Sequence, residues 1–231
     1  MTHVVHPYAH RLGIIRDWRS RWFAGDKKSY RSNILIDEKI RRYIKAKLRS
    51  AFVSEVEIER TQTELKVIIH SARPGVVIGR SGENATKLRK ELTALVARID
   101  KNHGRKLSLD ILEIRQPETN ASVVGMMVVE GLEKHMPFRR VGKTILEKVM
   151  AIKEVEGVRI VLSGRLGGAD MARTEQMKKG RIPLQTFRAN IDYAHQEARM
   201  SYGAIGVKVW IYLGETYDQK QNVAAASNQP K

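Results

Sequence analysis

Two glycines, Gly79 and Gly82, enclose Arg80 and Ser81 between a short apolar run and a segment with helical periodicity. Glycine has no Cβ, so its backbone can approach a sugar–phosphate chain closely. The loop leads into the start of a predicted helix, where free N–H groups and the helix dipole favour anions. Arg80 adds a mobile positive charge. These four residues are therefore predicted to grip a nucleic-acid backbone; a connector between two helices without a ligand is the alternative.

Other glycine-rich phosphate sites do not fit this loop. A P-loop requires two glycines separated by four residues, followed by Lys and then Ser or Thr. Gly75 and Gly79 are one residue too close and are followed by Arg80. A dinucleotide-binding fingerprint needs a third glycine and a later acidic residue in a strand–helix–strand unit, and neither is present here. No cofactor is therefore expected.

A second group of candidate residues, Arg139, Arg140 and Lys143, lies off the apolar stripe of one predicted helix. Arg139 and Lys143 are one turn apart, and Arg140 and Lys143 are three residues apart, so the charges are neighbours on the helix surface. Because no acid lies within this trio, we expect their mutual repulsion to be uncompensated within the chain. An external polyanion would relieve it.

Positive charge also gathers in several other segments. In residues 1–35, arginines are interleaved with Trp18, Trp22 and Phe23, and this mixture can pair with phosphates and stack on bases. Alternatively, the aromatics pack on a neighbouring domain and the arginines are solvated. In a predicted helix over 37–49, cations without balancing carboxylates favour an RNA-facing surface over a solvated one. The candidate RNA ligands are Arg11, Arg16, Arg19, Arg21, Arg41, Arg42, Lys45, Arg165, Arg173, Lys178, Lys179 and Arg181.

The composition of the whole chain suits a polyanionic partner. The 231 residues carry 42 Lys+Arg against 25 Asp+Glu, a formal net charge of +17, which favours nucleic acid or an anionic membrane. The longest apolar run, residues 123–129, is far shorter than the roughly 20 residues that span a bilayer. The N-terminus lacks the features of a signal peptide. We therefore expect a cytoplasmic protein without a membrane partner.

Residue types that could support catalysis or bind a metal are scarce. The absence of cysteine excludes disulfides, thiolate catalysis and Cys-ligated metal sites. Three histidines lie among the first ten residues, but Pro7 interrupts them and no carboxylate accompanies them, so a docking tail is favoured over a metal site. Three glutamates alternate along a predicted strand over 53–59 and are expected to face water. We predict neither an enzyme nor a metal site.

The predicted elements of the first half follow a distinctive order. A helix over 37–49, with Asp37 as a candidate N-cap, precedes strands over 53–59 and 65–69. A short apolar turn over 74–78, the glycine loop, a long helix from about Glu83 and a strand over 107–114 follow. This order, with the glycines between two helices, resembles a type II KH domain.

The second half is predicted to form another α+β domain. Residues 116–118 form the expected boundary, and helices are predicted over 119–134 and from Pro137 onwards. Strands are expected over 158–162 and 207–213, with extended, partly paired structure over 171–189. The expected division is a basic and aromatic arm over 1–35, a KH domain over 36–115, helices on a mainly antiparallel sheet over 117–214, and a disordered tail over 215–231.

Long strings of residues resemble one known family. The run from Ser163 to Glu175, the segment Gly180-Arg181-Ile182-Pro183-Leu184 and the segment 203–209 are similar to the C-terminal domain of the bacterial small-ribosomal-subunit protein S-three family. Segments of the first half match too, and the resemblance covers about residues 1–214. It implies a structural protein of the subunit head that binds ribosomal RNA and neighbouring head proteins, without a small-molecule substrate.

The same resemblance implies a role for the cationic trio. In bacterial relatives, a Phe-Arg-Arg-x-x-Lys segment faces messenger RNA at the entrance of its channel and supports unwinding. Phe138 to Lys143 matches that pattern, although Thr144 replaces a second basic residue that is frequent in the family. Gly142 is also a weak helix former, costing roughly 1 kcal/mol relative to Ala.

Two other functions remain as alternatives. The first is a free-standing KH-domain regulator of cellular RNAs, against which the basic arm and the second domain argue. The second is a nuclease, for which the sequence offers no combination of acids and metal ligands. Association with small subunits would separate the structural protein from the regulator, and magnesium-dependent cleavage would reveal the enzyme.

Overall fold

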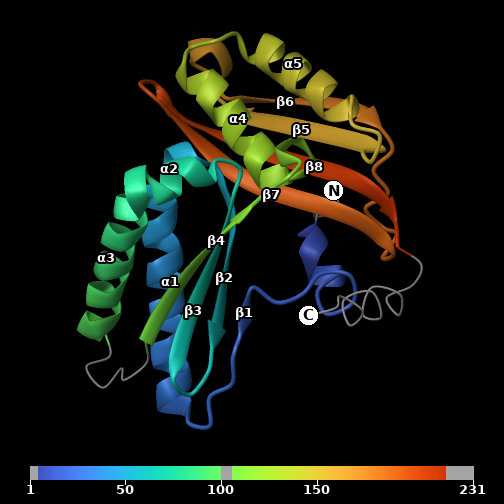
Figure 1. Cartoon of the computed structure of the whole chain (residues 1–231). Helices are drawn as coiled ribbons and strands as arrows, with labels where there is room; N and C mark the ends of the chain where they lie inside the picture. Colours follow the sequence, from blue (N-terminus) through green and yellow to red (C-terminus); the bar gives the residue numbers. More distant parts are fainter. Residues whose placement is uncertain (1–4, 100–105, 217–231) are drawn as a thin grey trace. The chain divides into compact units, whose positions relative to one another are not determined.

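The computed structural model describes residues 5–99 and 106–216 of the chain, which divide into two compact units (Figure 1). One unit spans residues 18–117; the other combines residues 5–17 with the second half. The predicted arm over 1–35 therefore spans both units. The histidine at position 3 and residues 217–231 of the predicted tail lie outside the described residues. No helix in the described part is long and apolar enough to cross a membrane.

The unit over 18–117 contains a mixed four-stranded sheet in the order β1-β2-β3-β4. The central pair, β2 (Val53–Arg60) and β3 (Glu64–Ser71), is antiparallel. β4 (Lys106–Glu113) pairs with β3 in parallel, and the two-residue β1 (Ser20–Arg21) pairs with β2 in parallel. The three longer strands confirm the predicted ones. β1 was not predicted, because two residues are too few to show an alternating pattern.

Helices supply the other layer of this unit. α1 (Lys27–Lys47) and α3 (Glu83–Ile99) pack on the sheet through stripes at helical spacing, such as Ile40 with Ile44 and Leu88 with Leu92. The short α2 (Pro74–Ile78) and a 3₁₀ turn over Arg80–Gly82 connect β3 to α3, and another 3₁₀ turn, Arg49–Ala51, follows α1. The predicted type II KH order is confirmed.

The start of α1 differs from its prediction. The helix begins at Lys27, with Asp26 in the N-cap position, and Asp37 lies inside it. The buried Asp37 carboxylate forms an ion pair with Arg60 of β2 and accepts a 2.8 Å hydrogen bond from Trp22 Nε1. The sequence pattern does not distinguish Asp37 from an N-cap residue, because the partners of its carboxylate come from other elements.

The second unit contains an antiparallel sheet in the order β6-β5-β8-β7. Its strands are β5 (Gly157–Gly164), β6 (Arg173–Gly180), β7 (Ala189–Met200) and β8 (Gly203–Glu215). α4 (Ala121–Glu133) and α5 (Phe138–Met150) lie across one face, as Figure 1 shows. Short 3₁₀ turns, Pro117–Thr119 and Leu166–Gly168, precede α4 and follow β5. This architecture confirms the predicted α+β class.

Residues 189–200 were not predicted as a strand. They combine alanines with Gln196, Glu197 and Arg199, which have weak β propensity, so pairing with β8 decides their conformation. At the other end, β8 continues to Glu215, and the Thr216 N–H donates to the Arg188 carbonyl at 2.9 Å. The first residues of the predicted disordered tail therefore belong to the folded unit.

Candidate nucleic-acid interface

The glycine loop adopts a backbone shape that few side chains tolerate. Gly79, Ser81 and Gly82 have φ values of +73°, +50° and +77°, in the left-handed region that favours glycine. A Cβ on Gly79 would also lie 2.6 Å from the Asn84 side-chain nitrogen, whereas Gly82 faces open space. Arg80 is exposed at the tip. The loop thus presents backbone and one cation to an incoming ligand.

The helix that follows the loop carries further exposed cations. Lys87 and Lys90 are three residues apart on α3 and both are exposed. Their spacing places them on neighbouring positions of the helix surface. Sequence reasoning did not select them, although a helical projection of α3 from Glu83 would have shown the grouping.

The expectation that the trio on α5 is uncompensated is wrong for Arg139. Its Nε and Nη2 donate to the two carboxylate oxygens of Glu175 on β6 at 3.2 and 3.1 Å. This paired hydrogen bonding lowers the pKa of the Glu175 carboxyl and raises the pKa of the Arg139 guanidinium. Glu175 lies 36 residues further along the chain, so a search within one helix could not find it.

Arg173 belongs to the same cluster as Arg139. Its Nε lies 3.4 Å from Glu175 Oε1, and its guanidinium carbon lies 5.6 Å from the centre of the Phe138 ring. The guanidinium carbon of Arg139 lies at the same distance from that ring. Two arginines therefore share one carboxylate and one aromatic ring, and the cluster keeps a net positive charge.

Arg140 and Lys143 are exposed, and neither has an ion-pair partner within the described ranges. Arg140 lies in the first turn of α5, which contains no acid. A cation at this end of a helix opposes the helix dipole, which costs roughly 0.3–1 kcal/mol when exposed. A bound anion would reverse the sign of that interaction, so this end of α5 is suited to a polyanion.

Gly142 within α5 has a packing role. A Cβ at this position would lie 2.2 Å from Met177 Cε and 2.6 Å from its sulfur. The missing side chain lets Met177 of β6 approach the helix closely. The same approach places Glu175, two residues earlier on β6, beside Arg139.

The position of Arg11 conflicts with its predicted contact to RNA. The side chain is 1% exposed, and its Nε donates to the Ala189 carbonyl at 2.6 Å. Its other nitrogens donate to the carbonyls of Pro7, Leu184 and Thr186 at 2.8 to 3.1 Å. Burial lowers the pKa of this guanidinium. Arg11 therefore joins the N-terminal segment to the loop before β7.

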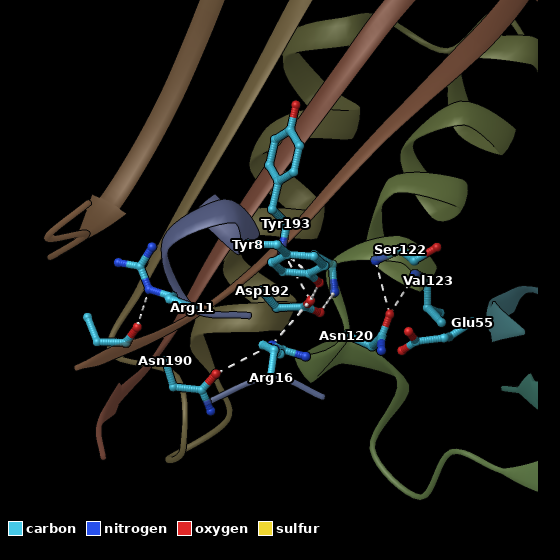
Figure 2. A network of polar contacts seen from close by, with 12 residues as sticks. Tyr8, Arg11, Arg16, Glu55, Asn120, Ser122, Val123, Asn190, Asp192 and Tyr193 are labelled. Atoms are coloured by element: carbon cyan, nitrogen blue, oxygen red, sulfur yellow. Dashed lines mark hydrogen bonds and ion pairs between the residues drawn. The ribbon is translucent and has the colours of Figure 1, made fainter. Parts of the chain in front are cut away.

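Arg16 also contacts its own unit. Its Nη2 lies 3.3 Å from the buried Asp192 carboxylate and 3.4 Å from Asn190 Oδ1. The guanidinium carbon also lies 5.1 Å from the centre of the Tyr8 ring. Figure 2 shows Tyr8 and Arg16 directed at the same carboxylate. The Nη2 group of Arg16 thus helps to fix residues 7–16, whereas its buried Nε has no hydrogen-bond acceptor in the described part of the chain.

Three predicted RNA ligands of the KH unit serve to hold β1. Arg19 pairs with Glu55, and Arg21 pairs with Glu57 and Glu59 at 3.1 and 3.2 Å. The predicted water-facing glutamates of β2 are therefore partners of the β1 arginines. Arg41 donates to Ser20 Oγ and to the Arg19 and Val56 carbonyls, and burial lowers its pKa.

The remaining candidates fall into two classes. Arg42 pairs with Glu38 on the surface of α1, so the expectation that no carboxylate balances the cations of this helix is wrong at this position. Arg165 contacts the Ala169 carbonyl and Asp170 in its own loop. The others are exposed and have no ion-pair partner in the described part of the chain: Lys45, Lys178, Lys179 and Arg181. Across residues 5–99 and 106–216, no group of three or more His, Asp or Glu side chains could hold a metal ion.

Comparisons with known proteins agree with this organisation. A family described as KH domain matches residues 39–119, and one described as ribosomal protein S3, C-terminal domain, matches residues 128–211. A protein of Caldicellulosiruptor bescii named small ribosomal subunit protein uS3 is 50% identical over 99% of this chain and 98% of its own length. The protein of the same name from Desulforudis audaxviator is 46% identical over 95% of this chain and 97% of its own length. The chain therefore belongs to the uS3 family of small ribosomal subunit proteins.

Proposed function

We propose that this protein is a structural constituent of the small ribosomal subunit that binds ribosomal RNA in the cytoplasm. Relatives that match nearly the whole chain are named as small-subunit proteins, which supports a structural and non-enzymatic role. The net charge of +17 supplies affinity for an RNA backbone, because phosphate contacts release counterions. Neighbouring proteins of the subunit head are further proposed partners.

The second part of the proposal is contact with messenger RNA through α5 at the entrance of its channel. Arg140 and Lys143 carry this inference, because they are exposed and unpaired among the described residues at the positive end of a helix. Arg139 contributes less positive charge to this site, because its ion pair with Glu175 partly neutralises it. The site suits the phosphates of a single strand, which such cations bind without reading sequence.

Sedimentation tests the structural role. The tagged protein, expressed at its natural level, is expected to sediment with small subunits at low and moderate salt. A protein that remains in the soluble fraction while small subunits assemble normally would be a free-standing RNA-binding regulator, and the ribosomal proposal would be wrong.

Translation of structured messengers tests the α5 site. Arg140→Ala with Lys143→Ala is expected to slow translation through a stable hairpin more than through an unstructured messenger. The matched control is Lys148→Ala with Lys153→Ala, which removes two exposed cations from the same helix and the loop after it. Equal slowing on both messengers, or the same effect in the control, would count against the channel proposal.

A further proposed contact is that of the glycine loop with an RNA backbone. Replacing Gly79 or Gly82 would strain the backbone, so Arg80→Gln is the cleaner variant. We expect it to weaken RNA binding more than Arg98→Gln, which neutralises an exposed arginine at the other end of α3. Equal affinities of the two variants would make the loop a connector only.

A further inference from the structure

The two sheets of this protein differ in how they compensate charge on the face that the helices leave uncovered. In the KH unit, Arg21 pairs there with Glu57 and Glu59. His70 lies 3.2 Å from Glu57, and Lys66 lies 3.0 Å from Asp110. Each of these basic side chains therefore has an acidic partner on this surface. With its charges compensated in this way, the face can remain exposed to water without a partner.

The strand register defines the corresponding face of the second sheet. Residues directly opposite each other on paired strands point to the same side. Lys178 lies opposite Arg159, which lies opposite Trp210, and Val161 in the next row lies opposite Lys208. The intervening residues, such as Ile160 and Val209, belong to the core beneath α4 and α5. We call Arg159, Lys178 and Lys208, with their row neighbours, the open face.

Charge on the open face is not balanced. Within β5 to β8, the register places one acid, Glu197, on this side, against the cations Arg159, Lys178, Arg199 and Lys208. Lys178 and Lys208 are exposed and form no ion pair within the described residues. Unlike the KH sheet, this sheet therefore presents uncompensated cations.

Arg159 is oriented by neutral groups. Its Nη2 donates to Gln176 Oε1 at 2.8 Å, and its guanidinium carbon lies 5.1 Å from the centre of the Trp210 ring. Its buried Nε has no acceptor in the described part of the chain. Trp210 is only 5% exposed. The buried indole thus packs against the Arg159 guanidinium and is not available for stacking on a base.

We propose that the open face is a further RNA-binding surface, which takes the phosphate backbone of structured RNA; this inference rests on the proposed binding of ribosomal RNA. Neighbouring strands are separated by about 4.8 Å and successive same-side residues by about 6.8 Å, so the cations form a compact array. Exposed cations without an exposed aromatic partner bind phosphates and leave bases unread. Because α5 covers the opposite side of the same sheet, this surface is separate from the proposed messenger site.

The test uses the full-length protein and a short, blunt RNA duplex whose binding is followed by fluorescence anisotropy. The variant is Lys178→Gln with Lys208→Gln, and the control is Lys148→Gln with Lys153→Gln, which changes the net charge equally. We expect the variant to bind about five-fold more weakly than the control at physiological salt. The slope of log affinity against log salt should fall by about 1.4 to 1.8 for two lost phosphate contacts.

Affinity and salt slope equal to those of the control would overturn the proposal. If the variant then failed to join small subunits, the open face would bind an acidic protein instead. The messenger site is tested separately, by Arg140→Gln with Lys143→Gln on a single-stranded RNA. The two sites can therefore fail independently of each other.

Discussion

Asp192 on β7 accepts a 2.7 Å hydrogen bond from the backbone N–H of Ala121, the first residue of α4, across 71 positions of sequence. The same carboxylate accepts from the Tyr8 hydroxyl and lies 3.3 Å from Arg16 (Figure 2). The Asn120 side chain also caps α4, because its Oδ1 accepts a 3.0 Å hydrogen bond from the Ser122 N–H. One buried acid therefore joins a helix start, an edge strand and the N-terminal segment.

Loss of this acid should destabilise the second unit. Asp192→Ala leaves the Ala121 N–H, the Tyr8 hydroxyl and Arg16 without their shared acceptor, so we expect a loss of about 2–4 kcal/mol. Urea unfolding followed by tryptophan fluorescence measures it. The control is Asp170→Ala, which removes a fully exposed carboxylate and should leave the free energy of unfolding nearly unchanged. Similar losses in both variants would contradict the role of Asp192.

Tyr8 makes stability depend on pH in the alkaline range. Burial, followed by the charge of Asp192, raises the pKa of its phenol. The folded protein therefore keeps the proton where the unfolded chain, with a pKa of about 10, has lost it. This contribution is complete below about pH 10 and declines as the pH rises further. Tyr8→Phe should thus lose less stability than the parent protein between about pH 9 and 11, as measured by urea unfolding. Equal losses would refute the assignment.

His135 follows α4 in a conformation that suits glycine. Its φ is +56°, its N–H donates to the Leu132 carbonyl, and the Met136 N–H donates to the Gly131 carbonyl, as in a Schellman ending. A non-glycine residue in this region is strained by about 1–2 kcal/mol. Allowing for the greater freedom of glycine in the unfolded chain, His135→Gly should stabilise the protein by about 0.5–1 kcal/mol. His135→Val should destabilise it in the same thermal unfolding assay.

Glu175 should limit the affinity of α5 for RNA. The carboxylate competes with phosphate for Arg139 and Arg173, and ion pairs near the surface are weak because water and salt screen them. Glu175→Gln is therefore expected to strengthen binding of a single-stranded RNA by about two- to five-fold. Asp170→Asn, which removes an exposed carboxylate at Arg165, is the control. Weaker binding by Glu175→Gln would show that the carboxylate orients the arginines instead.

The sequence predicted those elements in which apolar residues recur with the period of a helix or strand and are buried on one face. Leu88, Leu92 and Val96 recur at helical spacing and are buried on α3, and the alternation around Ile58 and Val67 marks β2 and β3. The start of α1 and the strand β7 were missed for one reason. Asp37 and Gln196 interrupt the apolar pattern of their own segments. Their hydrogen-bond and ion-pair partners come from other elements, which a local pattern does not reveal.

Local patterns and long matching strings in the sequence were enough to predict the KH order and the family, because both are carried by residues close together in the chain. Only the tertiary structure decided which of the many cations remain available for a ligand. Arg11 is buried among backbone carbonyls and Arg139 is paired with Glu175, whereas Arg140, Lys143, Lys178 and Lys208 are exposed. Coulomb interactions depend on distance in space, and residues that neutralise one another can lie far apart in sequence.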